Sequence, residues 1–526
     1  MTARKTNILF INTDQQRADS LGCYGNSIVK TPNIDRLAEE GVLFENAYCV
    51  HPLCSPSRTT WLTGRYIHSH GYWRNGRGVR EGEIYQSAVL KENNYKTALI
   101  GKAHLTPTHG DPHKYLESYQ TINGISEDEC WNFWKNYNDP YFGFEHVRLS
   151  IGHGDRCVNG GHYASWLHEN FPEKVPLFFK EQALDPDDVS YQSWKSAVPL
   201  EIHPATWIAD ETIAFMEKNK DQPFFATVGF QEPHPPFNPP APYCYMYNPE
   251  DMPSPPYREN EWGDDPPEHI KFYLERNRWD RVTKDKEREI LAHYYGAVTM
   301  LDDAIGRILK ALDDLGLAEN TMVVFTSDHG DWLGDHKLWL KGAVHTRGLI
   351  RVPLIMKWPG AAKAGLRIKS VASQIDLAST LYDAVNVKEP YGVQGKSMRK
   401  VLAGEAGAVR DYALVEHRHE CYREDSPLAN RLAADLAACE KRKKMERELV
   451  NWRDKDLIFK TIVTDQYRLT YAPAIGYGEL FDYREDPNEC CNLWDTHVEL
   501  RKSLLIKLLD ALIESTDPLP EREYRL

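Results

Sequence analysis

The sequence predicts an α/β protein with a large, mostly parallel central sheet, helices on both faces of that sheet, and a smaller C-terminal α+β domain with a short antiparallel sheet. Near-continuous apolar runs of strand length are the first observation, and amphipathic helical segments between them are the second. The third is length, because 526 residues exceed one ordinary hydrophobic core. We therefore expect a large domain over residues 1–380 and a smaller one over residues 381–526.

Four apolar runs predict buried parallel strands, over residues 7–13, 95–100, 223–230 and 322–327. Polar residues able to do chemistry follow each run. In open α/β sheets, ligands bind beyond the carboxyl ends of the strands. We therefore expect the following side chains to gather at one edge of the sheet: Asp14, Gln15, Lys102, His104, His234, Asp328 and His329.

Helical patterns fill the intervals between the predicted strands. Thr31 and Pro32 are expected to cap and start a short helix, which Gly41 ends. Apolar residues recur at helical spacing over residues 301–315, directly before the fourth strand, and again over residues 500–512. A helix followed by a strand is the order typical of an α/β fold.

In two segments the apolar residues do not recur with the period of a helix or of a strand. Residues 105–200 and 237–262 are expected as loops rich in aromatic residues, which would shape a substrate pocket, fill the core or contact another subunit. The charged residues around 440–444 are expected on a solvated helix face.

The segment Cys54-Ser-Pro-Ser-Arg58 indicates a nucleophile at the start of a helix. Its proline suits a first helical turn, and Arg58 lies one turn after Cys54 on the same face. Free N–H groups at a helix start stabilise an anionic nucleophile or substrate. The alternative for a single cysteine is a buried structural thiol.

This pentapeptide and its continuation Leu62-Thr-Gly-Arg65 resemble the signature of the sulfatase family, within the alkaline phosphatase superfamily. The resemblance implies an alkaline-phosphatase-like catalytic domain. It also implies that a formylglycine-generating enzyme oxidises Cys54 to formylglycine, an aldehyde that is hydrated to a geminal diol. Residues 467–471 and 479–493 resemble the small C-terminal domain of sulfatases, so the likeness extends over almost the whole chain.

Asp14, Gln15, Asp328 and His329 are the predicted ligands of one divalent cation. Taken alone, such pairs after strands are more often caps or turns. An oxygen-rich set suits Ca²⁺, Mg²⁺ or Mn²⁺, and the imidazole widens the choice towards Mn²⁺. The resemblance implies Ca²⁺ first. Gln15 and His329 depart from the commonest sulfatase pattern and resemble the phosphonate monoester hydrolase branch and some bacterial sulfatases.

The resemblance also implies roles for five basic residues. Arg58 would hold the diol, while His234 or Lys341 would supply the leaving oxygen with a proton or positive charge. Lys102 would neutralise the oxygens of the transferred group, and His104 would take a proton so that the covalent intermediate collapses to the aldehyde. The structural alternatives are a surface ion pair for Arg58, a surface lysine for Lys341 and a polar strand end for residues 101–104.

Asn75 and Arg347 are candidate substrate-binding residues with equally good alternatives. Asn75 would contact a substrate oxygen, or simply form an Asn-Gly turn with Gly76. Arg347 would recognise an anionic group on the substrate, or pair with an acidic neighbour.

Three functions follow from these residues. The first is a sulfatase that cleaves an aryl, alkyl or saccharide sulfate monoester, and Lys102 with His104 favours it. The second is a phosphonate monoester hydrolase or phosphodiesterase that uses the same site, which Gln15 and His329 favour. The third is a catalytically silent sulfate-binding scaffold, which predicts a missing nucleophile, lysine or ligand, and none is missing from the sequence.

Composition limits the kinds of binding partner and the compartment that we expect for this protein. A net charge of −14 argues against nucleic acid, and no run approaches the roughly 20 apolar residues that span a membrane. Ten cysteines without paired spacing do not form a disulfide framework, and the N-terminal residues have no signal-peptide pattern, so we expect a cytoplasmic protein. The sequence leaves open whether the protein forms a homo-oligomer.

Overall fold

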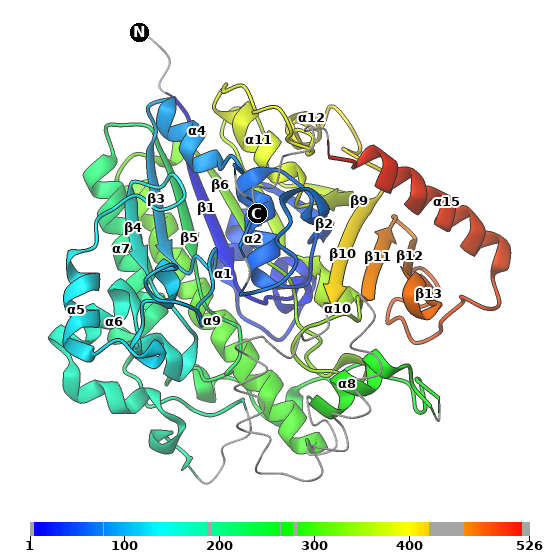
Figure 1. Cartoon of the computed structure of the whole chain (residues 1–526), viewed down its shortest axis with the longest axis horizontal. Helices are drawn as coiled ribbons and strands as arrows, with labels where there is room; N and C mark the ends of the chain where they lie inside the picture. Colours follow the sequence, from blue (N-terminus) through cyan, green and yellow to red (C-terminus); the bar gives the residue numbers. More distant parts are fainter. Residues whose placement is uncertain are drawn as a thin grey trace.

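The computed structural model describes residues 5–76, 78–80, 82–186, 192–263, 265–276, 282–419 and 457–517. The charged segment around residues 440–444 lies outside these residues, and so do residues 1–4. The described chain forms a large sheet between helices and, beside it, a small sheet with the long helix α15 (Figure 1). Both parts of the predicted α/β architecture are therefore confirmed.

The central sheet has nine strands within the described residues, in the order β4-β3-β5-β1-β6-β8-β2-β7, with β9 paired to β2. Strand β1 is central and runs parallel to both of its neighbours, β5 and β6. Within this sheet, the antiparallel pairs of described strands are β2 with β7, β2 with β8 and β6 with β8. The strands are β1 (Asn7–Thr13), β2 (Val42–Tyr48), β3 (Lys96–Gly101), β4 (His146–Leu149), β5 (Phe224–Gly229), β6 (Thr321–Ser327), β7 (Arg351–Val352), β8 (Leu354–Lys357) and β9 (Leu366–Ser373).

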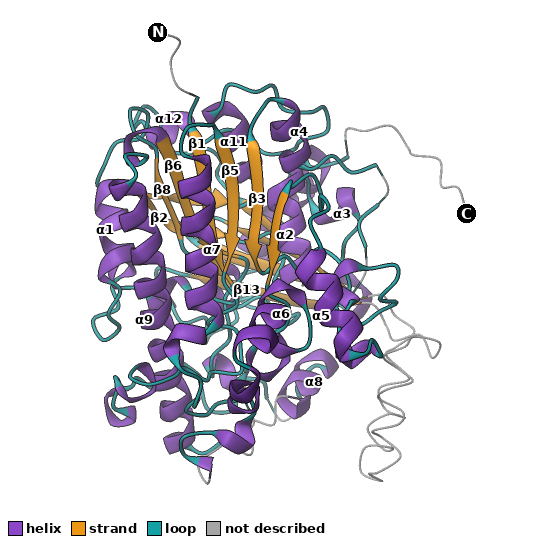
Figure 2. Cartoon of the chain, turned by 90° about the vertical axis from the view of Figure 1, so that its left-hand side faces the viewer, coloured by secondary structure: helices purple, strands orange, loops and turns teal. Residues whose placement is uncertain are grey.

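Side chains of β1 alternate between two buried cores, one on each face of the sheet. Ile8 and Phe10 belong to one core, and Leu9 and Ile11 to the other. Helices cover both faces (Figure 2). The first core contains residues of α2 (Cys54–Thr63), α4 (Gln86–Glu92), α5 (Glu127–Asn136), α11 (Asp376–Ala384) and α12 (Arg399–Leu402). The second contains residues of α1 (Pro32–Glu40), α6 (Gly161–Asn170), α7 (Pro204–Asn219) and α9 (Lys284–Asp314).

The expectation of loops over residues 105–200 is wrong in part. This segment contains α5, α6 and the strand β4, which extends the sheet by pairing in parallel with β3. Strand β4 has only four residues, of which Val147 and Leu149 are buried. A run this short is too brief for its alternation to be recognised in the sequence.

Helix α1 starts at Pro32 as predicted, but Thr31 does not cap it with its side chain. The carboxylate of Asp302, on α9, accepts instead from the backbone N–H groups of Asn33, at 3.0 Å, and Ile34, at 2.8 Å. The free N–H groups of the first turn are thus satisfied by a residue distant in sequence.

The smaller sheet is antiparallel and has four strands within the described residues, in the order β10-β11-β12-β13. Tyr66 and Ile375 of the large part join a third core with Leu414, Leu469 and Leu508 of the small one. The domain boundary at residue 380 stays a prediction, and α11 runs across that residue. The elements are β10 (Ala413–His419), β11 (Leu457–Val463), β12 (Tyr467–Ala472), β13 (Tyr477–Asp482) and α15 (Val498–Glu514).

Further helical elements are α3 (Ile67–His70), α8 (Glu268–Arg276), α10 (Arg347–Ile350) and the 3-10 helix η14 (Asp335–Lys337). Among the described residues, no helix combines the length and the apolar character that crossing a membrane requires.

Candidate active site

The register of the central strands brings two acidic residues together. Thr13 at the end of β1 is opposite Ser327 at the end of β6, so Asp14 and Asp328 follow side by side. The end of β3 lies beside β5, where Gly101 is opposite Gly229. A side chain at Gly101 would meet the Gly229 carbonyl oxygen at 2.1 Å, so only glycine allows this close approach.

Cys54 is the first residue of α2, as the sequence predicts. The side chain of Asn75 reaches this helix start, and its Oδ1 accepts from the backbone N–H of Ser55 at 3.0 Å. Asn75 thus supports the turn that carries Cys54, and its predicted contact with substrate stays a prediction.

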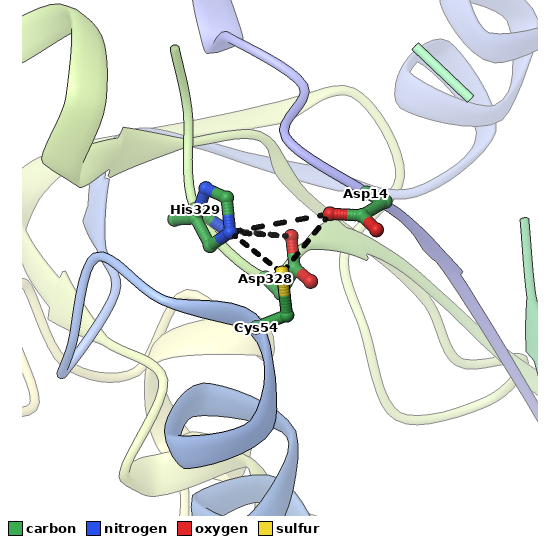
Figure 3. Close-up of side chains that lie close together, drawn as sticks. All are labelled: Asp14, Cys54, Asp328 and His329. Carbon is green, nitrogen blue, oxygen red and sulfur yellow. Dashed lines mark hydrogen bonds and ion pairs between the residues drawn. The ribbon is translucent and has the colours of Figure 1, made fainter. Parts of the chain in front are cut away.

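Cys54, Asp14, Asp328 and His329 point towards one another (Figure 3). The Cys54 Sγ atom lies 3.5 Å from Asp14 Oδ1 and 3.3 Å from His329 Nε2. His329 Nε2 is 3.6 Å from Asp328 Oδ1. All four residues are buried, and Cys54 is only 1% exposed. The strand ends and the start of α2 therefore build one compact, acidic centre around the thiol.

Arg58 holds this centre together from the second turn of α2. Its Nε donates to Asp328 Oδ2 at 2.9 Å, and its Nη1 donates to Asn12 Oδ1 at 2.8 Å and to the Lys102 carbonyl oxygen at 3.2 Å. The guanidinium thereby joins the ends of β1, β6 and β3. The ion pair is buried, unlike the surface pair that was the alternative.

Two lysines bring positive charge to the thiol and the carboxylates. Lys341 Nζ donates to Cys54 Sγ at 2.9 Å and lies 3.4 Å from His329 Nε2. Lys102 forms an ion pair with Asp14 Oδ2. Burial, with help from the charge of Lys341, lowers the pKa of Lys102 to about 7. Burial also raises the pKa of the Cys54 thiol, although Lys341 acts in the opposite direction.

The acidity of Asp328 follows from its neighbours. Burial disfavours the ionised carboxylate, but His329, Arg58 and the two lysines outweigh it and lower the pKa of Asp328. Burial lowers the pKa of His329 to about 3, so its imidazole is neutral at pH 7. An ionised carboxylate beside a neutral imidazole is a set of donors ready for a cation.

His153 belongs to the site, although the sequence did not predict it. Its Nε2 lies 2.9 Å from Asp14 Oδ2 and 2.8 Å from Lys102 Nζ. Its ring stacks on that of His234 with centroids 3.7 Å apart. His153 precedes a 3-10 turn in an irregular segment, so no strand end or motif marks it in the sequence.

His104 and His234 lie at the border of the centre. His104 follows Lys102 by two residues, and its buried Nδ1 has no hydrogen-bond partner among the described residues. Its backbone N–H donates to Glu117 Oε2 at 2.7 Å, which fixes the turn. His234 Nδ1 contacts the Pro235 carbonyl oxygen at 2.6 Å.

The residues fit a divalent cation. Gln15 Nε2 donates to Asp331 Oδ2 at 2.5 Å, which leaves Gln15 Oε1 buried and without a hydrogen-bond partner among the described residues. Gln15 follows Asp14 in the chain, and its backbone N–H donates to Asp328 Oδ1 at 2.9 Å. Two carboxylates, a neutral imidazole and an amide oxygen without a donor are the type of set that binds Ca²⁺, Mg²⁺ or Mn²⁺.

Arg347 does not take part in this cluster. Its Nη2 donates to Asn46 Oδ1 at 3.2 Å, and its guanidinium lies over the ring of Tyr483 at 4.8 Å. The side chain does not form an ion pair with a carboxylate among the described residues. Its acidic neighbours are Asp19 and Glu489, which lie beyond ion-pair distance of the guanidinium, and Glu489 Oε2 accepts from the Arg347 backbone N–H at 2.5 Å.

Comparison with known proteins identifies the family. The sulfatase family model matches residues 6–387. An arylsulfatase of Clostridium perfringens is 30% identical over 518 residues, which cover 96% of this chain and 95% of that protein. Iduronate 2-sulfatase of Mus musculus is 32% identical, over 76% of this chain and 68% of its own length.

Among solved structures, the chain is similar to the phosphonate monoester hydrolase of Agrobacterium radiobacter, with a TM-score of 0.76 and 26% identity. The match covers 98% of this chain and 96% of that one, so it includes both sheets.

Proposed function

Because the chain belongs to the sulfatase family of sulfuric ester hydrolases, we propose that it hydrolyses a sulfate monoester with one divalent cation and a formylglycine made from Cys54. The observation that carries the proposal is the position of the Cys54 Sγ atom. It lies 3.5 Å from Asp14 Oδ1, 3.3 Å from His329 Nε2 and 2.9 Å from Lys341 Nζ. A merely structural thiol would be surrounded by apolar groups.

Asp14, Gln15, Asp328 and His329 are the residues that would hold the cation, with Ca²⁺ expected and Mn²⁺ or Mg²⁺ as alternatives. When bound, the cation would make the diol hydroxyl more acidic and draw negative charge from a substrate oxygen. The buried Arg58 would keep Asp328 ionised and in place, since its Nε donates to that carboxylate at 2.9 Å.

In the first half of the reaction, one hydroxyl of the residue 54 diol attacks the sulfur, and the ester oxygen leaves. Lys341 is the nearest cation to Cys54 among the described contacts and would balance the charge on the leaving oxygen. His234, whose ring stacks on His153 at 3.7 Å, would take the proton that the attacking hydroxyl releases and pass a proton to the leaving oxygen, because burial and the nearby positive charges lower its pKa and keep the imidazole neutral beforehand.

In the second half, the sulfated diol collapses. His104 would take the proton of the remaining hydroxyl, the carbon–oxygen bond to the sulfate breaks, and the aldehyde re-forms before water hydrates it again. The buried Nδ1 of His104 has no described partner and is free for this proton. Lys102 and His153, 2.8 Å apart, would bind the departing sulfate oxygens.

A second candidate, hydrolysis of phosphonate monoesters or phosphodiesters, has specific support. The match to a phosphonate monoester hydrolase covers 98% of this chain, and Gln15 and His329 resemble that branch. Against it stands the pair Lys102 and His104, which that branch replaces by uncharged hydroxyl residues. We therefore place sulfate monoesters first.

The test is production of the chain together with a formylglycine-generating enzyme. Peptide mass analysis should find the aldehyde at residue 54, and the protein should release sulfate from members of a panel of sulfated sugars and small aryl and alkyl sulfates. Cys54→Ala should abolish release. Cys244→Ala, which removes a buried thiol outside the cluster, is the matched control. Undiminished sulfate release by Cys54→Ala would contradict the proposal.

A further inference from the structure

The turn after β3, which carries Lys102 and His104, has an unusual backbone. Gly101 and His104 both have a positive φ angle, of 86° and 55°. Glycine adopts this conformation freely, whereas histidine does so only where its surroundings hold it there. The backbone N–H of Lys102 donates to the Gly229 carbonyl oxygen at 2.7 Å, which holds the first half of the turn. The second half, with His104, needs a different support.

Glu117 supplies that support with one buried carboxylate. Its Oε2 accepts from the His104 backbone N–H at 2.7 Å, and its Oε1 accepts from the N–H groups of Leu105 at 2.7 Å and Thr106 at 2.9 Å. The Tyr141 hydroxyl donates to the same Oε1 at 2.9 Å. Glu117 is only 2% exposed, and burial raises its pKa while these donors act in the opposite direction. Three successive backbone N–H groups therefore share one acceptor.

Glu117 is held beside the turn by contacts of its own segment. It lies on the 3-10 helix η3 (Leu116–Ser118). The Ser118 hydroxyl donates to the Pro107 carbonyl oxygen at 2.6 Å, and Gln120 Nε2 donates to the Thr108 carbonyl oxygen at 3.1 Å. These contacts keep Glu117 in place independently of its bond to the His104 backbone.

The place of His104 matters because proton transfer depends on geometry. In the proposed second half of the reaction, its imidazole takes the proton of the remaining diol hydroxyl. The electron pair of that O–H bond forms the carbonyl bond of the aldehyde, and the pair of the breaking carbon–oxygen bond leaves with the sulfate. Burial and the nearby positive charges lower the pKa of His104, so the imidazole is neutral and ready to accept the proton. A displacement of about 1 Å can slow such a step about a hundredfold.

We propose that Glu117 is a positioning residue for this second half: its carboxylate holds the backbone of His104 and thereby places the imidazole for proton transfer. The role rests on the proposed sulfatase function. Attack on the sulfur does not use His104, so loss of the Glu117 contact should leave the first half of the reaction unchanged.

Glu117→Gln tests this role with little change of shape. The amide offers one acceptor oxygen and one NH₂ group in place of two acceptor oxygens. If its oxygen stays with the larger group of donors around Oε1, its NH₂ group faces the His104 N–H, and a donor meets a donor. The variant thus breaks the contact to His104 first. Glu129→Gln makes the same change at an exposed carboxylate and is the matched control.

Kinetics with an aryl sulfate separate the two halves of the reaction. Release of the phenol completes the first half, so kcat/KM reports that half and kcat includes the second. In Glu117→Gln we expect kcat to fall roughly tenfold or more, kcat/KM to stay within about twofold of the wild type, and a burst of phenol to appear in the first turnover. His104→Ala should show the same pattern, and adding Glu117→Gln to it should lower kcat little further.

Two kinetic outcomes overturn the proposal. One is an unchanged kcat in Glu117→Gln, or an equal fall of kcat and kcat/KM without a burst. The other is a fall of kcat in the double variant that repeats the full effect of Glu117→Gln, because Glu117 then acts on more than His104. If Glu117→Gln does not fold, Glu117→Asp keeps the charge but shortens the reach of the carboxylate, and it should give the same pattern.

Diffraction from crystals of Glu117→Gln tests the contact without turnover. We expect the His104 imidazole to be displaced in a structure otherwise like the wild type, and an unmoved imidazole overturns the proposal. A wild-type protein that has the aldehyde at residue 54 but releases no sulfate gives a different result: it overturns the proposed function, and the kinetic role of Glu117 with it.

Discussion

At the scale of single residues, the Cys54 centre depends on balanced charge. Asp14 and Asp328 would repel each other, but Lys102 pairs with the first and Arg58 with the second. These positive charges offset the cost of burying two carboxylates side by side, and for Asp328 they lower the pKa against the opposing effect of burial. In the proposed function, these charges would hold a divalent cation and an anionic substrate close to residue 54.

Lys341→Ala should lower kcat/KM for a sulfate ester roughly a hundredfold or more, because the variant removes the cation 2.9 Å from the reacting side chain. Steady-state kinetics on protein with a verified aldehyde at residue 54 will measure this. Lys310→Ala, at a lysine whose side chain is 71% exposed, is the control. Equal kcat/KM in both variants would remove Lys341 from the mechanism.

Asp328→Asn should weaken metal binding more than about tenfold, since it removes a charged ligand and the partner of Arg58. Metal content after dialysis against a chelator, measured by elemental analysis, checks this. Asp314→Asn changes an exposed carboxylate and is the control. Undiminished metal content in Asp328→Asn would mean that the cation binds elsewhere.

The residues of the centre could be predicted to the extent that motifs or strand ends mark them. Asp14, Cys54 and Asp328 follow such signals. His153 could not be predicted, because an isolated histidine in an irregular segment reaches Asp14 only through the folding of residues 105–200. The guanidinium environment of Arg347 likewise depends on β2 and on the C-terminal part, which its local sequence does not report.

At the scale of elements, long regular segments could be predicted from the sequence. Short segments, and a helix start that a distant residue stabilises, could not. The predicted strand over residues 7–13 coincides with β1, because seven buried residues in a row give a strong signal. Strand β4 has only four residues, and its sequence signal is therefore weak. The start of α1 is satisfied by Asp302, which no local pattern around Thr31 could indicate.

The seam between α3 and β10 contains a charged network whose stability should depend on pH. His68 Nδ1 lies 2.9 Å from Glu416 Oε2, and Lys460 pairs with the same carboxylate. Burial opposes both ions, but Glu416 raises the pKa of His68, while Lys460 and His68 lower the pKa of Glu416 to about 2.

The two shifts have opposite consequences. The contribution of His68 is complete below its unfolded pKa of about 6.5 and is lost as the pH rises through the higher folded pKa. The contribution of Glu416 is complete above about pH 4.5 and is lost as the pH falls towards its folded pKa of about 2. The network should therefore stabilise the seam most between about pH 4.5 and 6.5.

Glu416→Gln should reduce the free energy of unfolding by about 2 kcal/mol near pH 6, because it leaves the half-buried cations His68 and Lys460 without their buried anion. It should also flatten the fall in melting temperature between pH 6 and 9. Thermal unfolding over this range measures both effects, with Glu499→Gln on the surface of α15 as the control. An unchanged pH profile in Glu416→Gln would contradict the assignment.

At the scale of the whole molecule, the fold joins groups that are far apart in the sequence. The ends of the strands near residues 14, 102 and 328 lie at the start of α2. The smaller C-terminal sheet lies beside the large one (Figure 1). The solved structure of a phosphonate monoester hydrolase from Agrobacterium radiobacter has a similar architecture over 98% of this chain, with a TM-score of 0.76. Within the proposed function, Lys102 and His104 favour sulfur at the reacting centre, whereas Gln15 and His329 favour phosphorus.

The most direct test of the account compares kcat/KM for an aryl sulfate and for the matching aryl phosphonate monoester, with one preparation whose residue 54 is verified as the aldehyde. We expect the sulfate to be the better substrate, because Lys102 and His104 are both present to receive a sulfuryl group and release it. A clear preference for the phosphonate ester would contradict the assignment as a sulfatase.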